Sequence, residues 1–452
     1  MTRTVVMWFR RDLRLADHPA LNAAAADGAR VVPLFVVDPT FATSGAVRQT
    51  FMRAALASLD TSMDHALVYR HGDPAEIVPA FAAEVGAEAV YVTRDHGPYG
   101  RRRDAAVAAS LSAAGSRLIG IGSNYAVEPG SVLKSDGTPY AVFTPFSRAW
   151  RAHGWARPVE RVDVHWHGAP AVRCDGPPPP IECAATLPAA TEQAQHDRWL
   201  AYLPSAHQYR DLRDLPAVEG TTRLSAALRW GLVHPRQLLA DLGDSEGHRT
   251  LASELAWREF YADVLFRRPE TAWRNLNPKM DAMVLDTDAS ARARFERWAT
   301  GTTGFPIIDA GMRQLLAEGW MHNRVRMLVA SFLVKDLHLP WQWGARHFMQ
   351  HLVDGDLASN SHGWQWAAGT GTDAAPYFRV FNPTTQALRF DATGEYVRRW
   401  VPELAAAPGL EGKAVHEPGL LRPPGYPEPM VDHGVEREEA LARYRHATAG
   451  SR

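Results

Sequence analysis

Glu254, Trp257 and Arg258 are side chains whose types and spacing suit the binding of a flat aromatic ligand. They stand at positions i, i+3 and i+4, so a helix would place them on one face. There the indole can stack on a ring system, and the charged groups can form hydrogen bonds with its polar edges. Taken alone, this spacing more often marks an amphipathic helix with an ordinary ion pair.

A second group of side chains that could contact such a ligand lies in the segment 319–328. Asn323, Arg324 and Met327 stand at i, i+1 and i+4 of an expected helix, whereas Arg326 points to a different side. The thioether of methionine is a polarizable, adaptable surface for a flat ligand. In isolation, a buried methionine beside two solvated arginines is the more common explanation.

An acidic pair, Asp354 and Asp356, opens a polar, tryptophan-rich segment that we interpret as a loop. It does not fit an EF-hand, because Ala358 replaces an oxygen ligand and no Glu closes the loop, so we expect no metal. The carboxylates can instead accept hydrogen bonds from a ribityl or ribose chain, or pair with the arginines of 319–328. Such a segment is hard to explain as core packing.

The segment 220–225 (GTTRLS), preceded by Tyr209 and Arg213, is a candidate phosphate site. Backbone amides and hydroxyls at the start of a helix bind anions well. A plain N-cap formed by Thr221 or Thr222 explains the same residues.

Four apolar runs predict buried strands with helices between them; the strands are 4–9, 30–37, 88–93 and 117–121, and the helices are 21–26, 47–59, 79–85 and 103–113. Alternating strands and helices imply a parallel sheet, so residues 1–128 are expected to form a doubly wound α/β domain. FRRDLRL, rather than G-x-G-x-x-G, follows the first strand, which argues against a dinucleotide dehydrogenase. The sequence contains no P-loop motif.

Residues 129–200, which include a run of prolines at 177–180, are expected to form an interdomain connector. Helical periodicity dominates residues 201–452, and the expected helices are 223–230, 235–242, 250–266, 289–299, 306–317, 321–337, 345–352 and 435–446. The predicted fold class is α/β plus all-α, with a parallel-sheet domain joined by the connector to an all-helical domain.

The composition is 46% hydrophobic and 22% charged residues with a formal charge of −1, which is typical of a soluble globular protein. A local basic groove for nucleic acid stays compatible with it, because binding depends on how charge is distributed. The apolar runs are too short for a membrane span, and the N-terminus has no signal-peptide pattern. With Cys174 and Cys183 outside any zinc-ligand spacing, we expect a cytoplasmic protein without a disulfide framework.

These segments together resemble the photolyase/cryptochrome family, and within it the class I cyclobutane pyrimidine dimer photolyases. The similarity covers nearly the whole chain, and its motifs are 8–14 (WFRRDLR), 140–146 (YAVFTPF), 257–261 (WREFY), 303–307 (TGFPI), 320–327 and 363–378. The combination is highly specific, although no single motif is. It implies a monomeric enzyme that uses light to split pyrimidine dimers in duplex or single-stranded DNA.

The resemblance implies FAD in the helical domain, active in its fully reduced anionic form. It assigns FAD contacts to Tyr209, Thr221, Thr222, Arg223, Leu224, Ser225, Arg324, Arg326, Asp354, Gly355, Asp356 and Asn360. Asn360 would face the flavin N5. Plant-type cryptochromes tend to carry Asp there, so Asn favours repair over signalling.

The resemblance also implies a pocket for a flipped-out dimer; photolyases are a standard example of base flipping. The catalytic residues would be Glu254, Trp257, Asn323, Arg324, Met327, Asn360 and Trp366. The DNA contacts would be Arg213, Glu254, Trp257, Arg258, Tyr261, Asn323, Arg324 and Gln386. Trp257 and Trp366 would stack on the dimer. A (6-4) photoproduct usually calls for a His pair, and Asn323 and Met327 on the corresponding helix favour the cyclobutane dimer.

Relatives pass electrons to the flavin through three tryptophans. Trp364 and Trp341 match the inner and middle positions, but the outer position, within 283–288, has no tryptophan. We expect slow photoreduction or a substitute such as Trp343, Trp298 or Trp273. Repair should survive, because it starts from flavin that is already reduced.

The α/β domain is expected to hold an antenna pigment. Tyr99 and Gly100 stand where the folate type has Asn and Glu, and the segment 95–104 instead resembles the deazaflavin type. The implied antenna residues are Arg48, Asp95, Arg103 and Arg229, with Arg229 replacing a lysine. This favours 8-hydroxy-5-deazaflavin over methenyltetrahydrofolate.

Two rival classes stay open. A photosensory cryptochrome would typically carry a long C-terminal extension, whereas this chain ends at Arg452 after a short tail. A light-independent helical DNA-binding module would leave the acidic segment and Asn360 unexplained.

Overall fold

The computed structural model describes residues 3–169, 171–372 and 378–449, so the part 373–377 of the motif 363–378 lies outside the described residues. The chain forms two compact units. Unit 1 comprises Met1–Cys183, Pro188–His207 and Thr222–Pro269, and unit 2 comprises Ala184–Leu187, Gln208–Thr221 and Glu270–Arg452. The helices between residues 225 and 267 therefore belong to the same compact unit as the N-terminal sheet.

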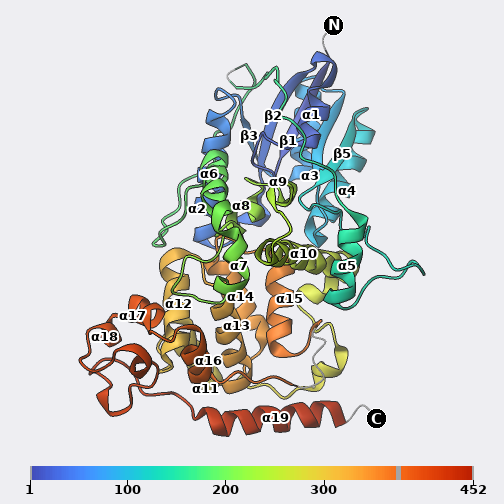
Figure 1. Ribbon diagram of the computed structural model, residues 1–452. Coiled ribbons are helices and arrows are strands. Elements are labelled where there is room, and N and C mark those ends of the chain that lie inside the picture. Colours follow the sequence, from blue (N-terminus) through green and yellow to red (C-terminus); the bar gives the residue numbers. More distant parts are fainter. Residues whose placement is uncertain (1–2, 170, 373–377, 450–452) are drawn as a thin grey trace. The chain divides into compact units, whose positions relative to one another are not determined.

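Unit 1 is built on a five-stranded parallel sheet in the order β3-β2-β1-β4-β5 (Figure 1). The strands are β1 (Thr4–Phe9), β2 (Arg30–Val37), β3 (Val68–His71), β4 (Ala89–Arg94) and β5 (Arg117–Ser123). The doubly wound fold predicted from the sequence is confirmed. The strand order reverses between β1 and β4, and ligands of such sheets bind outside the carboxyl ends of the strands at this switch point.

The strand β3 was missed in the sequence. Its sequence VYRH contains two basic residues, so it forms no apolar run. Arg70 is nevertheless buried, because Glu84 lies 2.6 Å and Asp175 3.5 Å from its guanidinium. Here an ion pair between residues distant in sequence replaces the apolar pattern that identified the other strands.

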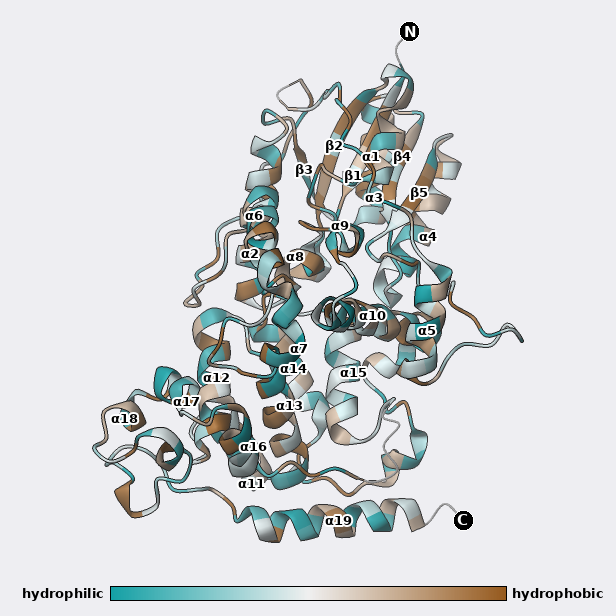
Figure 2. Cartoon of the chain, in the orientation of Figure 1, coloured by the Kyte–Doolittle hydropathy of each residue, from teal (hydrophilic) through white to brown (hydrophobic). Residues whose placement is uncertain are grey.

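Helices cover the sheet, and the helices of unit 1 are α1 (Pro19–Ala24), α2 (Ala46–Thr61), α3 (Pro74–Glu84), α4 (Pro98–Ala113), α5 (Phe143–His153), α6 (Glu192–Tyr202), α8 (Ser225–Trp230), α9 (Pro235–Asp241) and α10 (Glu246–Arg267). Val6 and Trp8 of β1 share an apolar cluster with Phe81 of α3 and Leu111 of α4. Strands buried on both faces read as continuous apolar runs, and Figure 2 shows β1 and β2 coloured as hydrophobic.

One face of α10 holds the residues that lead into the connector. Glu259 accepts hydrogen bonds from the backbone N–H groups of Ala126 and Val127 and from the indole N–H of Trp150 in α5. Burial raises the pKa of Glu259 to about 7, although the three N–H donors favour its ionised form. Glu259 therefore joins α10 both to residues 126–127, just before the connector, and to α5 within the connector, through one buried carboxyl group.

Replacing Glu259 by Ala is expected to lower the free energy of unfolding by about 3 kcal/mol, because three buried donors lose their acceptor. Since the folded-state pKa is raised above 4.5, the wild type should lose stability as the pH rises toward 7, and this slope should disappear in the variant. Urea denaturation at several pH values measures both effects. Glu160→Ala, an exposed carboxylate of the connector, should change stability by no more than about 0.5 kcal/mol.

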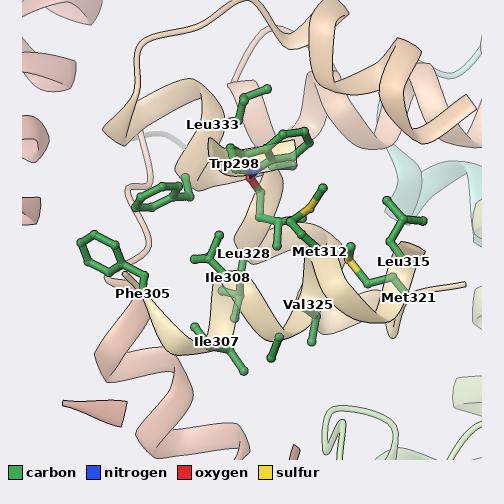
Figure 3. Packing of buried hydrophobic residues seen from close by; sticks show 14 of the residues in the cluster. Trp298, Phe305, Ile307, Ile308, Met312, Leu315, Met321, Val325, Leu328 and Leu333 are labelled. Atoms are coloured by element: carbon green, nitrogen blue, oxygen red, sulfur yellow. The ribbon is translucent and has the colours of Figure 1, made fainter. Parts of the chain in front are cut away.

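Unit 2 is helical, with α7 (Tyr209–Leu212), α11 (Ala289–Ala299), α12 (Pro306–Glu318), α13 (Asn323–Ser331), α14 (Trp341–His351), α15 (Leu357–Ala368), α16 (Pro383–Phe390), α17 (Glu395–Trp400), α18 (Pro402–Ala405) and α19 (His433–Ala449). Its apolar core gathers Trp298 with Ile308, Leu328 and Leu333 (Figure 3). The indole N–H of Trp298 donates to the carbonyl of Val329 at 3.0 Å, which satisfies the one polar atom of this buried ring.

Two expectations for unit 2 were wrong. The tryptophan-rich segment after Asp356 is the helix α15 and not a loop, and Trp364 on this helix packs in the apolar core. The single helix expected over 321–337 is α13 followed by a π-helical turn, Phe332–Asp336. In the first case polar residues interrupted the apolar spacing by which helices were recognised.

The part of the chain that the structure describes contains no helix long and apolar enough to cross a membrane. Cys174 and Cys183 are both free thiols. No three or more metal-ligating side chains gather among these residues.

Candidate functional site

An ion pair links α13 to the residues before α15. Arg326 donates from Nη1 and Nη2 to the two carboxylate oxygens of Asp354, at 3.2 and 2.8 Å, and from Nε to the carbonyl of Met321 at 2.8 Å. The Asp354 side chain is only 4% exposed. Of the two roles open to the carboxylates, Asp354 takes the pairing with an arginine. This two-pronged contact fixes both side chains in one geometry.

Asp356 and Asn360 lie one helical turn apart at the start of α15. Asp356 caps the helix, accepting hydrogen bonds from the N–H groups of Ala358 and Ser359 at 3.1 Å. Asn360 is buried, and its Nδ2 donates to the carbonyl of Ala345 at 3.0 Å. That bond orients the amide, so Oδ1 is the atom with which Asn360 can accept a hydrogen bond from a ligand.

Asp214 brings two predicted DNA-contacting arginines of unit 2 together. Its carboxylate lies 2.9 Å from Arg324 and 3.9 Å from Nε of Arg213. The guanidinium of Arg324 also lies over the ring of Phe390 on α16, 4.3 Å from its centroid, and Gln386 is on the same helix. Asp214 was missed in the sequence, because a single aspartate in an irregular segment has no periodic partner.

The backbone of 220–225 is irregular. Tyr209, which begins α7, is buried in unit 2. Arg223 has φ +51°, and the hydroxyl of Thr222 accepts a hydrogen bond from the N–H of Leu224 at 3.3 Å. Leu224, without a side-chain cap, is the N-cap of α8, so the plain threonine cap is wrong. A left-handed arginine is sterically costly, and such positions cluster at ligand sites.

The edge of α13 has the spacing expected from the sequence. Asn323 is exposed at the start of the helix, and Met327 is half-buried one turn later. The half-buried Trp366 is on α15, which packs against α13. The guanidinium of Arg379 lies 5.7 Å and the ring of Phe381 6.4 Å from the Trp366 ring centroid. Unit 2 therefore presents a methionine and a tryptophan from neighbouring helices.

Trp257 lies among three aromatic rings of unit 1. The ring of Phe143 is stacked on it, with centroids 3.6 Å apart and planes at 8°. Tyr261 and Phe260 contact the same indole at 5.3 and 5.8 Å. In the sequence Phe143 stands out only as part of the family motif 140–146, and no spacing rule could have paired it with Trp257.

Arg258 is engaged inside unit 1. Its Nη1 and Nη2 donate to the carbonyls of Asn124 and Leu228, at 3.0 and 3.1 Å, and its guanidinium lies 4.5 Å from the ring centroid of Tyr125. Glu254, on the same helix, is half-buried. With these donors committed to backbone carbonyls, Arg258 holds α10 to its surroundings, and its DNA contact stays a prediction.

Trp364 and Trp341, the two expected relay residues, both belong to the core of unit 2. Gly344, one turn after Trp341 on α14, lies directly against Trp364, since a Cβ at Gly344 would come within 2.1 Å of the indole. The indole N–H of Trp341 donates to Asn275 at 2.9 Å. Trp298 contacts Trp364 edge-on at 6.0 Å. Trp364 therefore borders both α14 and a third indole.

Trp298, one of the candidate substitutes for the outer tryptophan, leads toward Trp343. The ring of Phe295 lies 5.6 Å from Trp298 and 5.7 Å from Trp343. The guanidinium of Arg292 lies 3.8 Å from the Trp343 ring centroid. A second line of aromatic rings thus runs from Trp364 to a half-buried indole.

Arginines and aspartates gather at the switch point of the sheet in unit 1. Asp95 lies 3.6 Å from Arg11 and 3.5 Å from Arg103, and Asp104 pairs with Arg103 at 2.8 Å and with Arg10 at 2.6 Å. Burial opposes the ionisation of Asp95, but Arg11 and Arg103 outweigh it and lower the pKa of this carboxyl. Two of the expected antenna residues, Asp95 and Arg103, therefore meet here.

The other two expected antenna residues lie beside an aromatic pair. The guanidinium of Arg48 is 5.8 Å from the ring centroid of Phe41, and that of Arg229 is 5.1 Å from the ring centroid of Trp230. Phe41 and Trp230 contact each other at 5.7 Å. Arg48 and Arg229 are thus connected through these two rings.

Two family models match the chain. The model described as DNA photolyase matches residues 5–163, and the FAD binding domain of DNA photolyase matches residues 250–446. The deoxyribodipyrimidine photo-lyase of Streptomyces griseus is 40% identical, and the alignment covers 98% of each chain.

Solved structures agree with these matches. A bacterial class III photolyase from Agrobacterium tumefaciens is 35% identical with a TM-score of 0.88, covering 99% of this chain and 98% of the other. An archaeal photolyase from Sulfolobus tokodaii, solved with two FAD molecules, is 28% identical with a TM-score of 0.84, covering 98% and 99%. With the sheet of unit 1, the helices of unit 2 and relatives this similar along their whole length, the chain is an enzyme of the DNA photolyase family and carries that family's FAD-binding domain.

Proposed function

We propose that this enzyme repairs cyclobutane pyrimidine dimers in DNA with light absorbed by bound FAD. The observation that carries the proposal is the fixed polar set formed in unit 2 by the Arg326–Asp354 pair, Asp356 and Asn360, in a chain with the FAD-binding domain of photolyases. When bound in its fully reduced anionic form and excited by light, FAD supplies one electron to the dimer and takes it back. No net redox change results.

The polar groups of these residues suit the polar groups of FAD. The Oδ1 acceptor of Asn360 suits flavin N5, which carries a hydrogen in the reduced form. The hydroxyls and backbone N–H groups of 220–225 suit the phosphates. The residues proposed to bind FAD are Tyr209, Thr221, Thr222, Arg223, Leu224, Ser225, Arg324, Arg326, Asp354, Gly355, Asp356 and Asn360.

The lesion residues combine stacking surfaces with hydrogen-bonding groups. Trp257 and Trp366 each offer an indole, Met327 offers an adaptable apolar surface, and Glu254 can accept a hydrogen bond from a pyrimidine N–H. A damaged base is cheaper to flip out of the duplex than an intact pair. The proposed lesion and DNA residues are Arg213, Glu254, Trp257, Arg258, Tyr261, Asn323, Arg324, Met327, Asn360, Trp366 and Gln386.

The test is illumination of an oligonucleotide that contains one thymine dimer, with protein whose FAD has been reduced. Dimers should disappear in the light and persist in the dark. No light-dependent loss would overturn the proposal. Protein that binds FAD but leaves the dimer intact would favour the photosensory cryptochrome.

For the antenna we propose 8-hydroxy-5-deazaflavin, bound through Arg48, Asp95, Arg103 and Arg229 of unit 1. The charged cluster at the switch point supports a ligand at the carboxyl ends of β1 and β4. Methenyltetrahydrofolate and a second FAD are the alternatives. Mass spectrometry of pigment extracted from protein of the native host decides, and a folate or a flavin as the second pigment would overturn the deazaflavin.

We also propose a separate function for each of three segments of the chain. Residues 1–128 hold the antenna, 129–200 connect, and 201–452 bind FAD and DNA, in a monomer. The contacts of Trp150 with Glu259 and of Gly130 with Asp263 support a connector of fixed course. Light scattering of the FAD-loaded protein tests the monomer, and a mass near 49.9 kDa is expected.

A further inference from the structure

Phe143 lies flat on one face of the Trp257 indole. The ring centroids are 3.6 Å apart and the planes deviate by 8°. This is the thickness of one aromatic ring, so no base can enter between the two. A base that stacks on Trp257 must therefore use the opposite face of the indole.

The position of Phe143 is fixed by the anchoring of α5 on α10. Phe143 is the first residue of α5, and two other residues of this helix contact α10. The indole N–H of Trp150 donates to the buried carboxyl of Glu259, and the ring of Phe146 lies 5.1 Å from that of Phe260. Phe146 and Trp150 thus attach α5 to α10, and this attachment holds Phe143, at the start of the same helix, against Trp257.

Two further rings contact the Trp257 indole. Phe260 meets it at 74° and Tyr261 at 43°, so that with Phe143 three rings surround it. Contacts on this many sides select one rotamer of the indole before a ligand arrives. A ring that is already ordered loses less entropy when a ligand binds.

We propose that Phe143 is a positioning residue for lesion recognition, which backs Trp257 so that this indole presents one fixed face to the dimer. The inference rests on the proposed function, in which Trp257 stacks on the dimer. Phe143 itself does not touch the lesion. Its contribution is to keep the opposite face of Trp257 in place, where stacking on a base adds to the affinity.

The test compares affinities, measured in the dark, for duplexes with and without a single thymine dimer. Phe143→Ala should weaken binding of the dimer duplex about tenfold and leave binding of the undamaged duplex unchanged, because undamaged DNA is held mainly through its phosphates. Phe143→Tyr, which keeps the stacked ring, should restore the preference for the dimer. FAD content per chain should equal that of the wild type in both variants.

The matched control is Tyr140→Ala. Tyr140 belongs to the same short segment, and its ring contacts Phe146 at 6.4 Å rather than Trp257. It should retain the dimer preference of the wild type. A loss as large as that of Phe143→Ala would mean that the segment acts as a whole, and would overturn the specific role of Phe143.

A double-mutant cycle separates positioning from general stability. In a Trp257→Ala background, Phe143→Ala should cause no further loss of dimer affinity, since the face that it supports is gone. An equal loss in both backgrounds would overturn the proposal, and so would tighter binding by Phe143→Ala, which would mean that Phe143 obstructs the lesion. A wild type without dimer preference or light-dependent repair would instead refute the proposed function itself.

Discussion

Replacing Trp364 by Phe is expected to slow the light-driven reduction of bound FAD by about 100-fold or more, equivalent to roughly 2.7 kcal/mol of activation free energy. Both lines of aromatic residues in unit 2 meet at Trp364, because α14 packs on it at Gly344 and Trp298 contacts it edge-on. Phenylalanine is much harder to oxidise than tryptophan, so the substitution interrupts both. Repair by protein reduced beforehand should be unchanged.

Photoreduction is measured as the loss of oxidised-flavin absorbance under blue light with a thiol present. Trp400→Phe is the matched control, because it removes an indole packed against the same apolar core without a place in either line. Each variant is compared at equal FAD content per chain. A Trp364→Phe protein that photoreduces at the wild-type rate would remove Trp364 from the relay.

Two further substitutions show which line carries the electron. Along the second line, the guanidinium over Trp343 disfavours the positive charge of an oxidised indole, so this exit is electrostatically poor. The guanidinium of Arg346 lies 5.5 Å from the Trp273 ring centroid, farther than Arg292 lies from Trp343, and Trp273 is 42% exposed, so water screens this charge more strongly. The carbonyl of Trp273 accepts a hydrogen bond from Gln342, the residue after Trp341. We therefore expect Trp341→Phe to slow photoreduction more than Trp298→Phe, with Trp273 as the exit. The reverse order would assign the relay to Trp298 and Trp343.

The fold could be predicted from the sequence wherever burial was visible as a pattern. The strands β1, β2, β4 and β5 are apolar runs, and α11 has the spacing of an amphipathic helix. The strand β3 was hidden because Arg70 is buried against Glu84, a partner on another element. The helix α15 was hidden because Asn360 and its polar neighbours face inward, where periodicity requires apolar residues.

At the candidate site, too, residue types could be interpreted from the sequence, whereas most contacts between distant residues could not be predicted. The types of Arg326 and Asp354 suggested a pairing, and the structure contains it. The contacts that hold the other side chains could not be predicted, since they join residues far apart in the chain with no periodic relation. Asp214 reaches Arg324, and Phe143 reaches Trp257, each across more than a hundred residues.

Asp354→Ala is expected to weaken FAD binding about 10- to 100-fold, because a charge-assisted hydrogen-bonding group is lost. It should also lower the free energy of unfolding by about 2 kcal/mol, since Arg326 loses its carboxylate partner and keeps the carbonyl of Met321. Arg326 is about one quarter exposed, so water offsets part of the cost of leaving its charge unpaired. The two effects are measured by flavin titration of FAD-free protein and by urea denaturation.

The controls separate charge from shape and the flavin site from general stability. Asp354→Asn keeps the shape and one acceptor but removes the charge, so its FAD affinity should lie between those of the wild type and Asp354→Ala. Asp211→Ala, at an exposed aspartate of α7 in the same unit, should change neither quantity. If Asp354→Ala loses stability but binds FAD as the wild type does, the Arg326–Asp354 pair only holds α13 in place. If both fall together, the same carboxylate orders the helix and the cofactor, which explains why it is buried.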